Sequence, residues 1–190
     1  MYERDIVIRE HKGKYLYTFL EDYVVVDIET TGLNPTYNEI IEIGALRVRN
    51  NEIVESMDIL IKPEEPISAF ITNLTGITNE MVAKEGVSAF EALATFLDFV
   101  QNEVILGHNV NFDLSFLYDH CLRHLGCYVE NNYADTCYMA RRMLKGKVKN
   151  NKLGTLIEYF GYDYTGAHRA VNDCQFTYQI YNELKQLHKK

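Results

Sequence analysis

The sequence predicts a mixed α/β sheet with helices packed on its faces, built as one domain. A β-branched, almost wholly apolar run at 23–29 is typical of a central strand that is buried on both faces. Two further strand patterns follow it, and after residue 88 short strand patterns alternate with helical ones. The length of 190 residues, with three prolines and no Ser- or Gly-rich linker, suits a single domain.

The first part of the chain divides into an N-terminal extension, 1–22, and the main domain, 23–190. Within the extension, alternating apolar side chains over 5–20 indicate a hairpin. After the first main strand, we expect strands at about 40–48 and 52–61. Asn50-Asn51 between them suits a tight hairpin turn.

The second part of the chain carries most of the helices. Ser88 is expected to cap a helix that runs to about Gln101, with Glu91 at the capping-box position. The other expected elements are a strand at 104–106, a helix capped by Asn111, a strand near 133–134, and helices from Thr136, from Leu153 and from about Ala170 to Leu187.

Composition excludes several classes of protein. Hydrophobic residues make up 47% and charged residues 24%, which argues against a disordered chain. The net charge of −8 excludes a generally basic coat, although a local basic patch or metal ions can still hold nucleic acid. The four cysteines form no CxxC pair, the chain opens without a secretory signal, and no apolar run approaches the roughly 20 residues that cross a bilayer. We therefore expect a cytoplasmic protein with no membrane partner.

Two carboxylates stand out in the first strand. Asp27 and Glu29 are two residues apart, so both leave the same face of the strand. They lie at its carboxyl end, where α/β sheets usually build their sites. Two anions in an apolar strand repel each other and resist desolvation unless a cation joins them. A divalent metal answers that need.

Two further carboxylates lie in similar polar segments. Asp113 falls in the first turn of an expected helix, within the segment NVNFD at 109–113, and Asp173 ends the segment HRAVND at 168–173. Carboxylate oxygens suit Mg²⁺ or Mn²⁺, whereas structural zinc sites prefer Cys and His. Taken singly, each segment is more often a cap, an ion-pair partner or a surface group.

Together and in this order, the segments resemble the motifs of DnaQ-like (DEDDh) 3′→5′ exonucleases with the ribonuclease H-like fold. That family includes epsilon-type proofreading subunits and the exonuclease domain of PolC polymerases. The resemblance runs from residue 23 to about 187. It rests on DIETTG at 27–32, NVNFD at 109–113 and HRAVND at 168–173, with LTGIT at 74–78 similar to a loop that lines the terminal nucleotide in the family.

The resemblance implies a five-stranded sheet in the order 3-2-1-4-5, with helices on both faces. It implies metal-dependent hydrolysis at DNA 3′ ends that releases nucleoside 5′-monophosphates in proofreading or repair, with two divalent ions, Mg²⁺ or Mn²⁺. The implied catalytic residues are Asp27, Glu29, Asp113, His168 and Asp173, and the four acids are the metal ligands. By analogy, Asp27 bridges both ions, Glu29 and Asp173 complete the site of the ion that activates water, and Asp113 supports the leaving-group side.

His168 is the candidate general base, because an imidazole titrates near neutral pH. A five-residue offset turns a helix by about 140°, so His168 and Asp173 cannot share a helix face. We therefore expect His168 in the loop after Gly166. The alternative is a histidine near a helix N-terminus that has no role.

Other residues are candidates for substrate binding. Besides His168, Thr30 and Thr75 can hydrogen bond to the terminal nucleotide, and Leu33 and Leu74 can pack against its base; the alternative for both leucines is ordinary core. The run at 141–152 holds six of the 19 basic residues and no acid. It can follow phosphates, or it can be a solvated helix end and loop.

The expected partner is the 3′ end of single-stranded or frayed DNA, with a DNA polymerase as a second candidate. Two other functions stay open. One is an exoribonuclease of the same superfamily, because the active site needs no sensor of the ribose 2′-OH that the sequence would reveal. A nucleic-acid or polymerase-binding module without catalysis is the alternative outside the enzymes, and the intact set of five residues argues against it.

Overall fold

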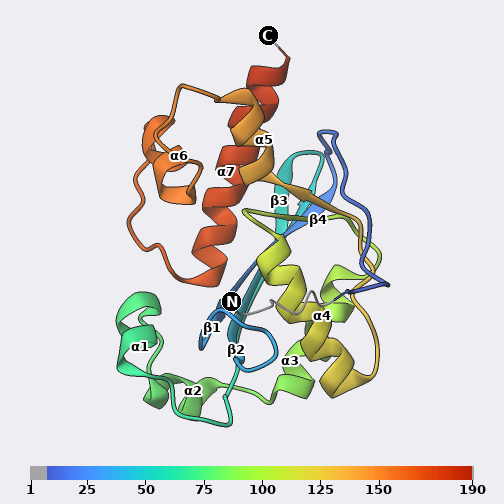
Figure 1. The fold of residues 1–190 in the computed structure, drawn as a ribbon, viewed down its shortest axis with the longest axis vertical. Coiled ribbons are helices and arrows are strands. Elements are labelled where there is room, and N and C mark those ends of the chain that lie inside the picture. The colour runs from blue at the N-terminus through green and yellow to red at the C-terminus, as the bar shows by residue number, and fades with distance from the viewer. Residues whose placement is uncertain (1–7, 190) are drawn as a thin grey trace, which may run out of the picture.

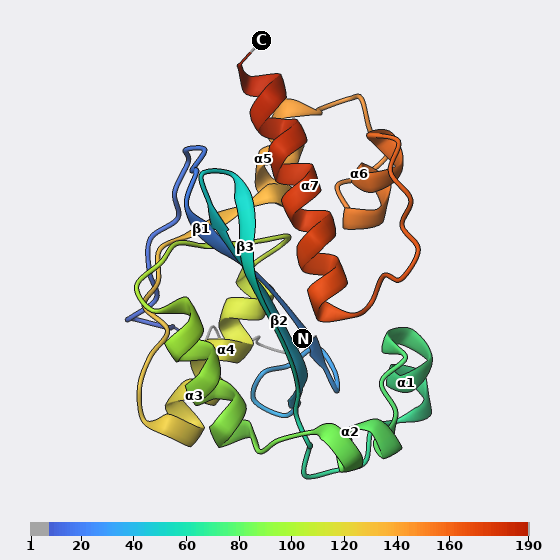
Figure 2. The ribbon, with the colours of Figure 1, turned by 180° about the vertical axis from the view of Figure 1, so that it is seen from behind.

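A computed structural model describes residues 8–189 and contains one five-stranded sheet in the order β3-β2-β1-β4-β5 (Figures 1 and 2). The strands are β1 (Tyr23–Thr30), β2 (Ile40–Arg49), β3 (Glu52–Leu60), β4 (Ile105–Gly107) and β5 (Tyr133–Asp135). β2 runs antiparallel to β1 and β3, whereas β4 runs parallel to β1 and β5. The order implied by the resemblance is confirmed. The carboxyl ends of β1, β4 and β5 therefore meet at one edge of the sheet.

Helices cover both faces of the sheet, and two short helices lie beyond its end (Figures 1 and 2). The helices are α1 (Ala69–Thr75), α2 (Asn79–Glu85), α3 (Ala89–Val100), α4 (Asn111–Leu125), α5 (Thr136–Met143), α6 (Leu153–Tyr159) and α7 (Ala170–His188). α3 and α4 pack on one face, and α5, α6 and α7 pack on the other. Among the described residues, none of these helices has the length and apolar character that a membrane span requires.

The alternation of side chains along β1 decides which face carries the acids. Val24, Val26 and Ile28 belong to the core that contains α3 and α4. Tyr23 and Val25 belong to the core beneath α5, α6 and α7. Because side chains alternate with period two, Asp27 and Glu29 lie on the same side as α7.

α7 begins almost in contact with the backbone of β2. A Cβ atom on Gly44 would lie 2.4 Å from the carbonyl carbon of Ala170 and 2.5 Å from the nitrogen of Val171. Gly44 is also the residue that pairs with Asp27 across the β1–β2 ladder. The missing side chain therefore lets the first turn of α7 lie directly beside the strand pair that carries Asp27.

Two local expectations from the sequence are confirmed. Asn50 and Asn51 connect β2 to β3, and their φ angles of 50° and 66° are those of a two-residue hairpin turn. Ser88 caps α3, because its side chain accepts a hydrogen bond of 3.2 Å from the nitrogen of Glu91.

Two local expectations are wrong. Leu74 and Thr75 do not lie in a loop but in the last turn of α1, which Ser68 caps and Gly76 ends with φ 74°. A seven-residue helix with several β-branched residues carries too little apolar periodicity to be recognised. Asn111 is not a cap: the chain is already helical at Val110, and the Asn111 side chain instead accepts a hydrogen bond from Lys12.

The described part of the N-terminal extension packs along β5, the strand at one edge of the sheet. The nitrogen of Leu16 donates to the oxygen of Tyr133 over 2.8 Å, and Arg9 forms an ion pair of 2.6 Å with Asp119 on α4. The expected hairpin spans 5–20, and the part of its first arm before residue 8 lies outside the described residues; Tyr15, in the expected second arm, forms a bridge with Tyr133. The hairpin and the division at residue 22 therefore stay predictions.

Candidate active site

The two acids of β1 lie in an environment that disfavours their charge. Asp27 and Glu29 are both half-buried. Burial, followed by the charges of Asp113 and Asp173, raises the pKa of Asp27 well above its ordinary value. Burial and then Asp173 raise the pKa of Glu29 to about 8. Both shifts indicate a site where several anions meet, and the charge of Arg169 offsets only part of the shift of Glu29.

Asp113 reaches the same place from the opposite face of the sheet. It lies in the first turn of α4 and is 4% exposed. Its Oδ1 accepts a hydrogen bond of 3.2 Å from the nitrogen of Ile28, the residue between Asp27 and Glu29. Burial raises the pKa of Asp113 to about 8, although this bond and its own N–H oppose the shift. The hydrogen bond therefore fixes the carboxyl group of Asp113 against β1.

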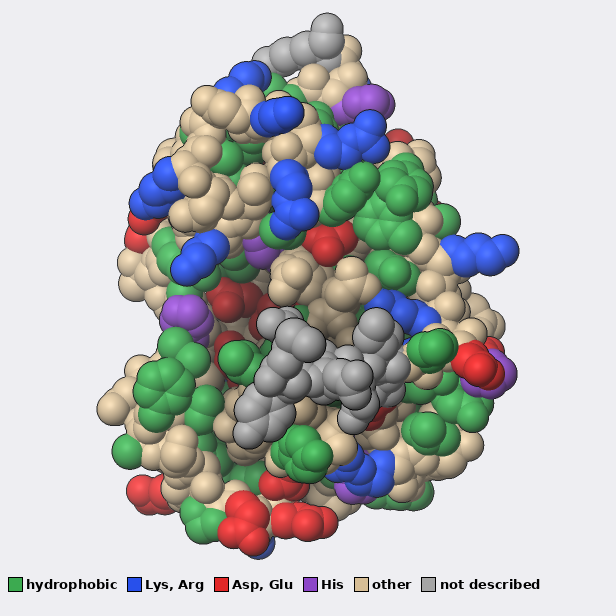
Figure 3. All heavy atoms as spheres, viewed as in Figure 1, with side chains coloured by type: hydrophobic (Ala, Val, Ile, Leu, Met, Phe, Trp, Pro, Cys, Tyr) green, Lys and Arg blue, Asp and Glu red, His purple; other side chains and the backbone are tan. Residues whose placement is uncertain are grey.

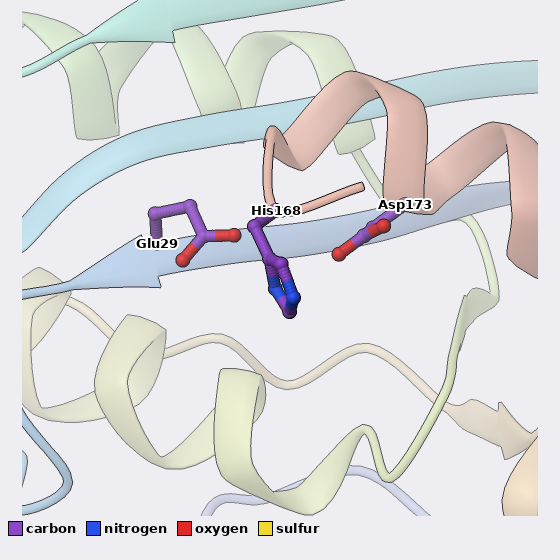
Figure 4. A group of neighbouring side chains, drawn as sticks. All are labelled: Glu29, His168 and Asp173. Atoms are coloured by element: carbon purple, nitrogen blue, oxygen red, sulfur yellow. The ribbon is translucent and has the colours of Figure 1, made fainter. Parts of the chain in front are cut away.

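His168 and Asp173 complete the group from α7 and the loop before it. Figure 4 shows both side chains converging with Glu29. One ligand atom from each of the three lies within 4.8 Å of the other two. Asp173 is 7% exposed, and its buried Oδ1 has no hydrogen-bond partner. Burial raises the pKa of Asp173 to about 6, although the charge of His168 opposes this shift.

His168 lies in the loop before α7, as the sequence predicts. It is exposed and has a φ angle of 63°, in the left-handed region that residues with a side chain rarely adopt. Tyr164 lies beside it, with the two rings edge to face at 6.4 Å. Tyr164 is also close enough to Asp173, Asp27 and Glu29 for their charges to raise its pKa, after burial. Tyr164 is a wall of the site that the motifs did not indicate.

An ion pair beneath the site anchors the start of α7. Glu42, on β2, is fully buried, and its Oε1 accepts hydrogen bonds from Nε and Nη2 of Arg169 over 2.8 and 2.5 Å. Its Oε2 accepts a bond of 2.7 Å from the nitrogen of Ala170. Glu42 therefore holds the two residues that directly follow His168. The sequence signal for Glu42 is a single acid in a mostly apolar strand, which no motif marks.

The four carboxylates fit one or more divalent cations. Asp27, Glu29, Asp113 and Asp173 supply oxygen donors only, which Mg²⁺ and Mn²⁺ prefer. Two observations support the fit: the unpaired Oδ1 of Asp173, and the upward pKa shifts of all four groups. Buried carboxylates that repel one another are stabilised when a cation lies among them.

The candidate substrate-binding residues fall into two groups. The hydroxyls of Thr30 and Thr75 donate to the carbonyl oxygens of Gly32 over 2.6 Å and Ile71 over 3.0 Å. A substrate contact by these threonines would therefore use the oxygen lone pairs or the backbone. Leu33 is 85% exposed and Leu74 is 46% exposed, so neither leucine belongs to the core.

Comparisons with known proteins agree on one family. A family model described as exonuclease matches residues 24–181. The chain is 43% identical over 168 residues to the PolC-type DNA polymerase III of Caldanaerobacter subterraneus subsp. tengcongensis, covering 88% of this chain and 12% of that protein. It is 34% identical over 172 residues to the PolC-type DNA polymerase III of Bacillus subtilis, covering 90% of this chain and 12% of that protein. The chain thus spans a small part of the length of these relatives.

Solved structures show the same fold at lower sequence identity. Exonuclease I of E. coli in complex with a dT13 oligonucleotide has a TM-score of 0.78 and 20% identity, over 90% of this chain and 42% of that one. Exonuclease X in complex with 5′ overhanging duplex DNA has a TM-score of 0.70 and 23% identity, over 88% of this chain and 93% of that one.

Proposed function

The chain belongs to the exonuclease family, and on that premise we propose that it is a metal-dependent 3′→5′ exodeoxyribonuclease that releases nucleoside 5′-monophosphates from DNA 3′ ends. The convergence of Glu29, His168 and Asp173, beside Asp27 and Asp113, carries the proposal. The PolC-type DNA polymerase III relatives, at 34% and 43% identity, support DNA as the substrate.

In this mechanism, Asp27, Glu29, Asp113 and Asp173 would hold two divalent ions, Mg²⁺ or Mn²⁺. When bound, such ions supply Lewis-acid activation of water and stabilise charge on the phosphate and the leaving 3′ oxygen. His168 accepts the proton of the attacking water at an imidazole nitrogen, which its exposed position beside Glu29 and Asp173 allows. Arg169, held by Glu42, fixes the backbone on which His168 stands.

In this proposal, the segments around the four carboxylates hold the 3′ end of the DNA strand. Leu33 and Leu74 are exposed and offer apolar surface to the terminal base, which suits any sequence because every base has an apolar face. Thr75 follows Leu74 in the chain, and Thr30 lies three residues before Leu33. Both threonines contact the nucleotide through the backbone or oxygen lone pairs, and His168 contacts the scissile phosphate. The natural substrate is then a single-stranded or frayed 3′ end.

We place this activity in the cytoplasm, in DNA proofreading or repair with a DNA polymerase as partner. The relatives support this placement, because they are themselves PolC-type DNA polymerases III. Residues 23–190 form the exonuclease domain in this proposal, and 1–22 form its extension.

The test uses DNA and RNA oligonucleotides of matched sequence, labelled at the 5′ end, with Mn²⁺, Mg²⁺ or EDTA. We expect a ladder that shortens from the 3′ end of DNA, requires the metal, and is lost in Asp27→Asn. Asp98→Asn removes a carboxylate from an exposed position on α3 and serves as the matched control. Faster digestion of RNA would indicate an exoribonuclease. Tight binding without any digestion would indicate a module that has lost catalysis.

A further inference from the structure

A hollow of about 440 Å³ lies at the carboxyl ends of β4 and β5. Its walls include His108 and Asn109 after β4, Arg141 on α5, and Asn151 and Lys152 before α6. The hollow lies near the candidate active site, because Asn109 donates to Asp135, whose charge also acts on Asp113.

The hollow is basic within an acidic protein. None of its lining residues is acidic, and two of them, Arg141 and Lys152, are cations. They begin and end the run at 141–152, and within the described residues only Lys149 of its six cations has an ion-pair partner, Glu158 at 3.9 Å. By contrast, Arg9, on the N-terminal extension, forms a close ion pair with a carboxylate.

The surface shows the same separation of charge. In Figure 3, acidic side chains lie in a recess near the middle of the molecule, and basic side chains gather over the half above it. In the matching view of Figure 1, that half carries α5, α6 and α7. A nucleic-acid strand whose 3′ end lies in the acidic recess would have its phosphates attracted to the basic side chains of this half.

The walls of the hollow are held in place by hydrogen bonds. Nε2 of His108 donates to the carbonyl oxygen of Asn151 over 2.8 Å, and Nδ1 lies 2.8 Å from Oγ1 of Thr136. The nitrogen of Asn109 donates to Oδ1 of Asp135 over 3.0 Å. His108 thus ties the end of β4 to the loop that carries Lys152, so the two cations flank a preformed hollow.

We propose that this hollow binds backbone phosphates of the nucleic-acid strand on the 5′ side of the scissile bond, with Arg141 and Lys152 as the contacting cations. This inference rests on the proposed function, because a 3′ end held at the carboxylates leaves the rest of the strand outside them. The lining residues offer cations and amide groups and include no Phe, Tyr or Trp, and both ring nitrogens of His108 are already hydrogen bonded, so the hollow suits phosphates rather than bases. The contacts are therefore independent of sequence.

The test compares two double variants that remove equal charge from the same run. Arg141→Gln with Lys152→Gln alters the hollow, and Arg142→Gln with Lys145→Gln alters the run outside it. Binding of a fluorescent oligo-dT is measured by anisotropy with Ca²⁺ at several salt concentrations. Each phosphate contact to a single strand contributes about 0.7 to the slope of log K against log[salt], so we expect roughly 20-fold weaker binding near 0.1 M salt for the first variant only. Equal weakening in both variants would overturn the hollow as the site.

A substrate without upstream phosphates separates this inference from the proposed function. The p-nitrophenyl ester of thymidine 5′-monophosphate has one phosphate and offers nothing to the hollow. We expect the first variant to hydrolyse it at the wild-type rate, while its KM for the oligonucleotide rises and kcat stays unchanged. If the wild type hydrolyses neither substrate, the proposed function fails, and the binding titration still decides the hollow. Unchanged oligonucleotide affinity in the first variant would refute the inference alone.

Discussion

Removing metal ions should make the stability of this protein depend strongly on pH. Glu29 and Asp113 each have a pKa of about 8, raised by burial. In the folded protein these groups keep protons that the unfolded chain has already lost. Their contribution to stability is therefore complete below the ordinary carboxyl pKa and is lost as the pH rises through about 8.

The size of the effect follows from these two pKa values. Between about pH 6.5 and pH 9, each group lowers the free energy of unfolding by about 2 kcal/mol, or about 4 kcal/mol for both. Asp27 acts in the same direction, because its pKa is also raised. The lower limit of the window avoids His108 and His120, whose pKa values are lowered by burial and whose effect on stability has the opposite sign below about pH 6.5.

Urea unfolding followed by circular dichroism, in EDTA and in Mn²⁺, measures this effect. We expect a clear fall in the free energy of unfolding with rising pH in EDTA, and a much smaller one when Mn²⁺ occupies the carboxylates. Asp27→Asn should unfold less readily than the wild type at high pH in EDTA, whereas Asp98→Asn should follow the wild-type curve. A fall of less than about 1 kcal/mol in EDTA, or the same fall in Mn²⁺, would refute the electrostatic account of the site.

Three substitutions test individual residues. His168→Ala should lower kcat by about 10²- to 10⁴-fold while leaving Mn²⁺ affinity near normal; near-normal rates in single-turnover kinetics would exclude His168 as the general base. Asp173→Asn should weaken Mn²⁺ binding in a calorimetric titration, because a ligand charge is removed; unchanged affinity would remove Asp173 from the ligand set. Arg169→Ala should cost about 3 kcal/mol in urea unfolding, because it leaves the carboxylate of Glu42 buried with a single N–H partner, and a loss below about 1 kcal/mol would argue against that role.

The parts of the fold that depend on local pattern could be predicted from the sequence. An apolar strand that ends in two acids marks β1, and Ser88 and the Asn50-Asn51 pair mark a helix start and a turn. The order of the strands came only from the resemblance, because alternation shows which face a residue occupies and not which strand lies beside it.

The parts that depend on distant pairing could not be predicted in this way. Glu42 and Arg169 are 127 residues apart, and only the folded chain shows that the acid in β2 accepts from the residue after His168. Helix α1 was missed for a different reason, since its stability comes from capping by Ser68 and from packing of Ile71 rather than from a periodic pattern.

The close approach at Gly44 has a consequence for how finely the site is adjusted. Asp27, Glu29 and Asp113 are fixed to β1, whereas His168 and Asp173 move with the start of α7. The spacing between these two halves is set by one backbone resting on another, with no side chain between them that could change rotamer. Gly44 therefore sets the distance between α7 and β2. Any larger residue at position 44 would displace the start of α7, together with His168 and Asp173, from the acids held at β1. Every functional group would remain chemically intact, but the two sets would be too far apart to act together.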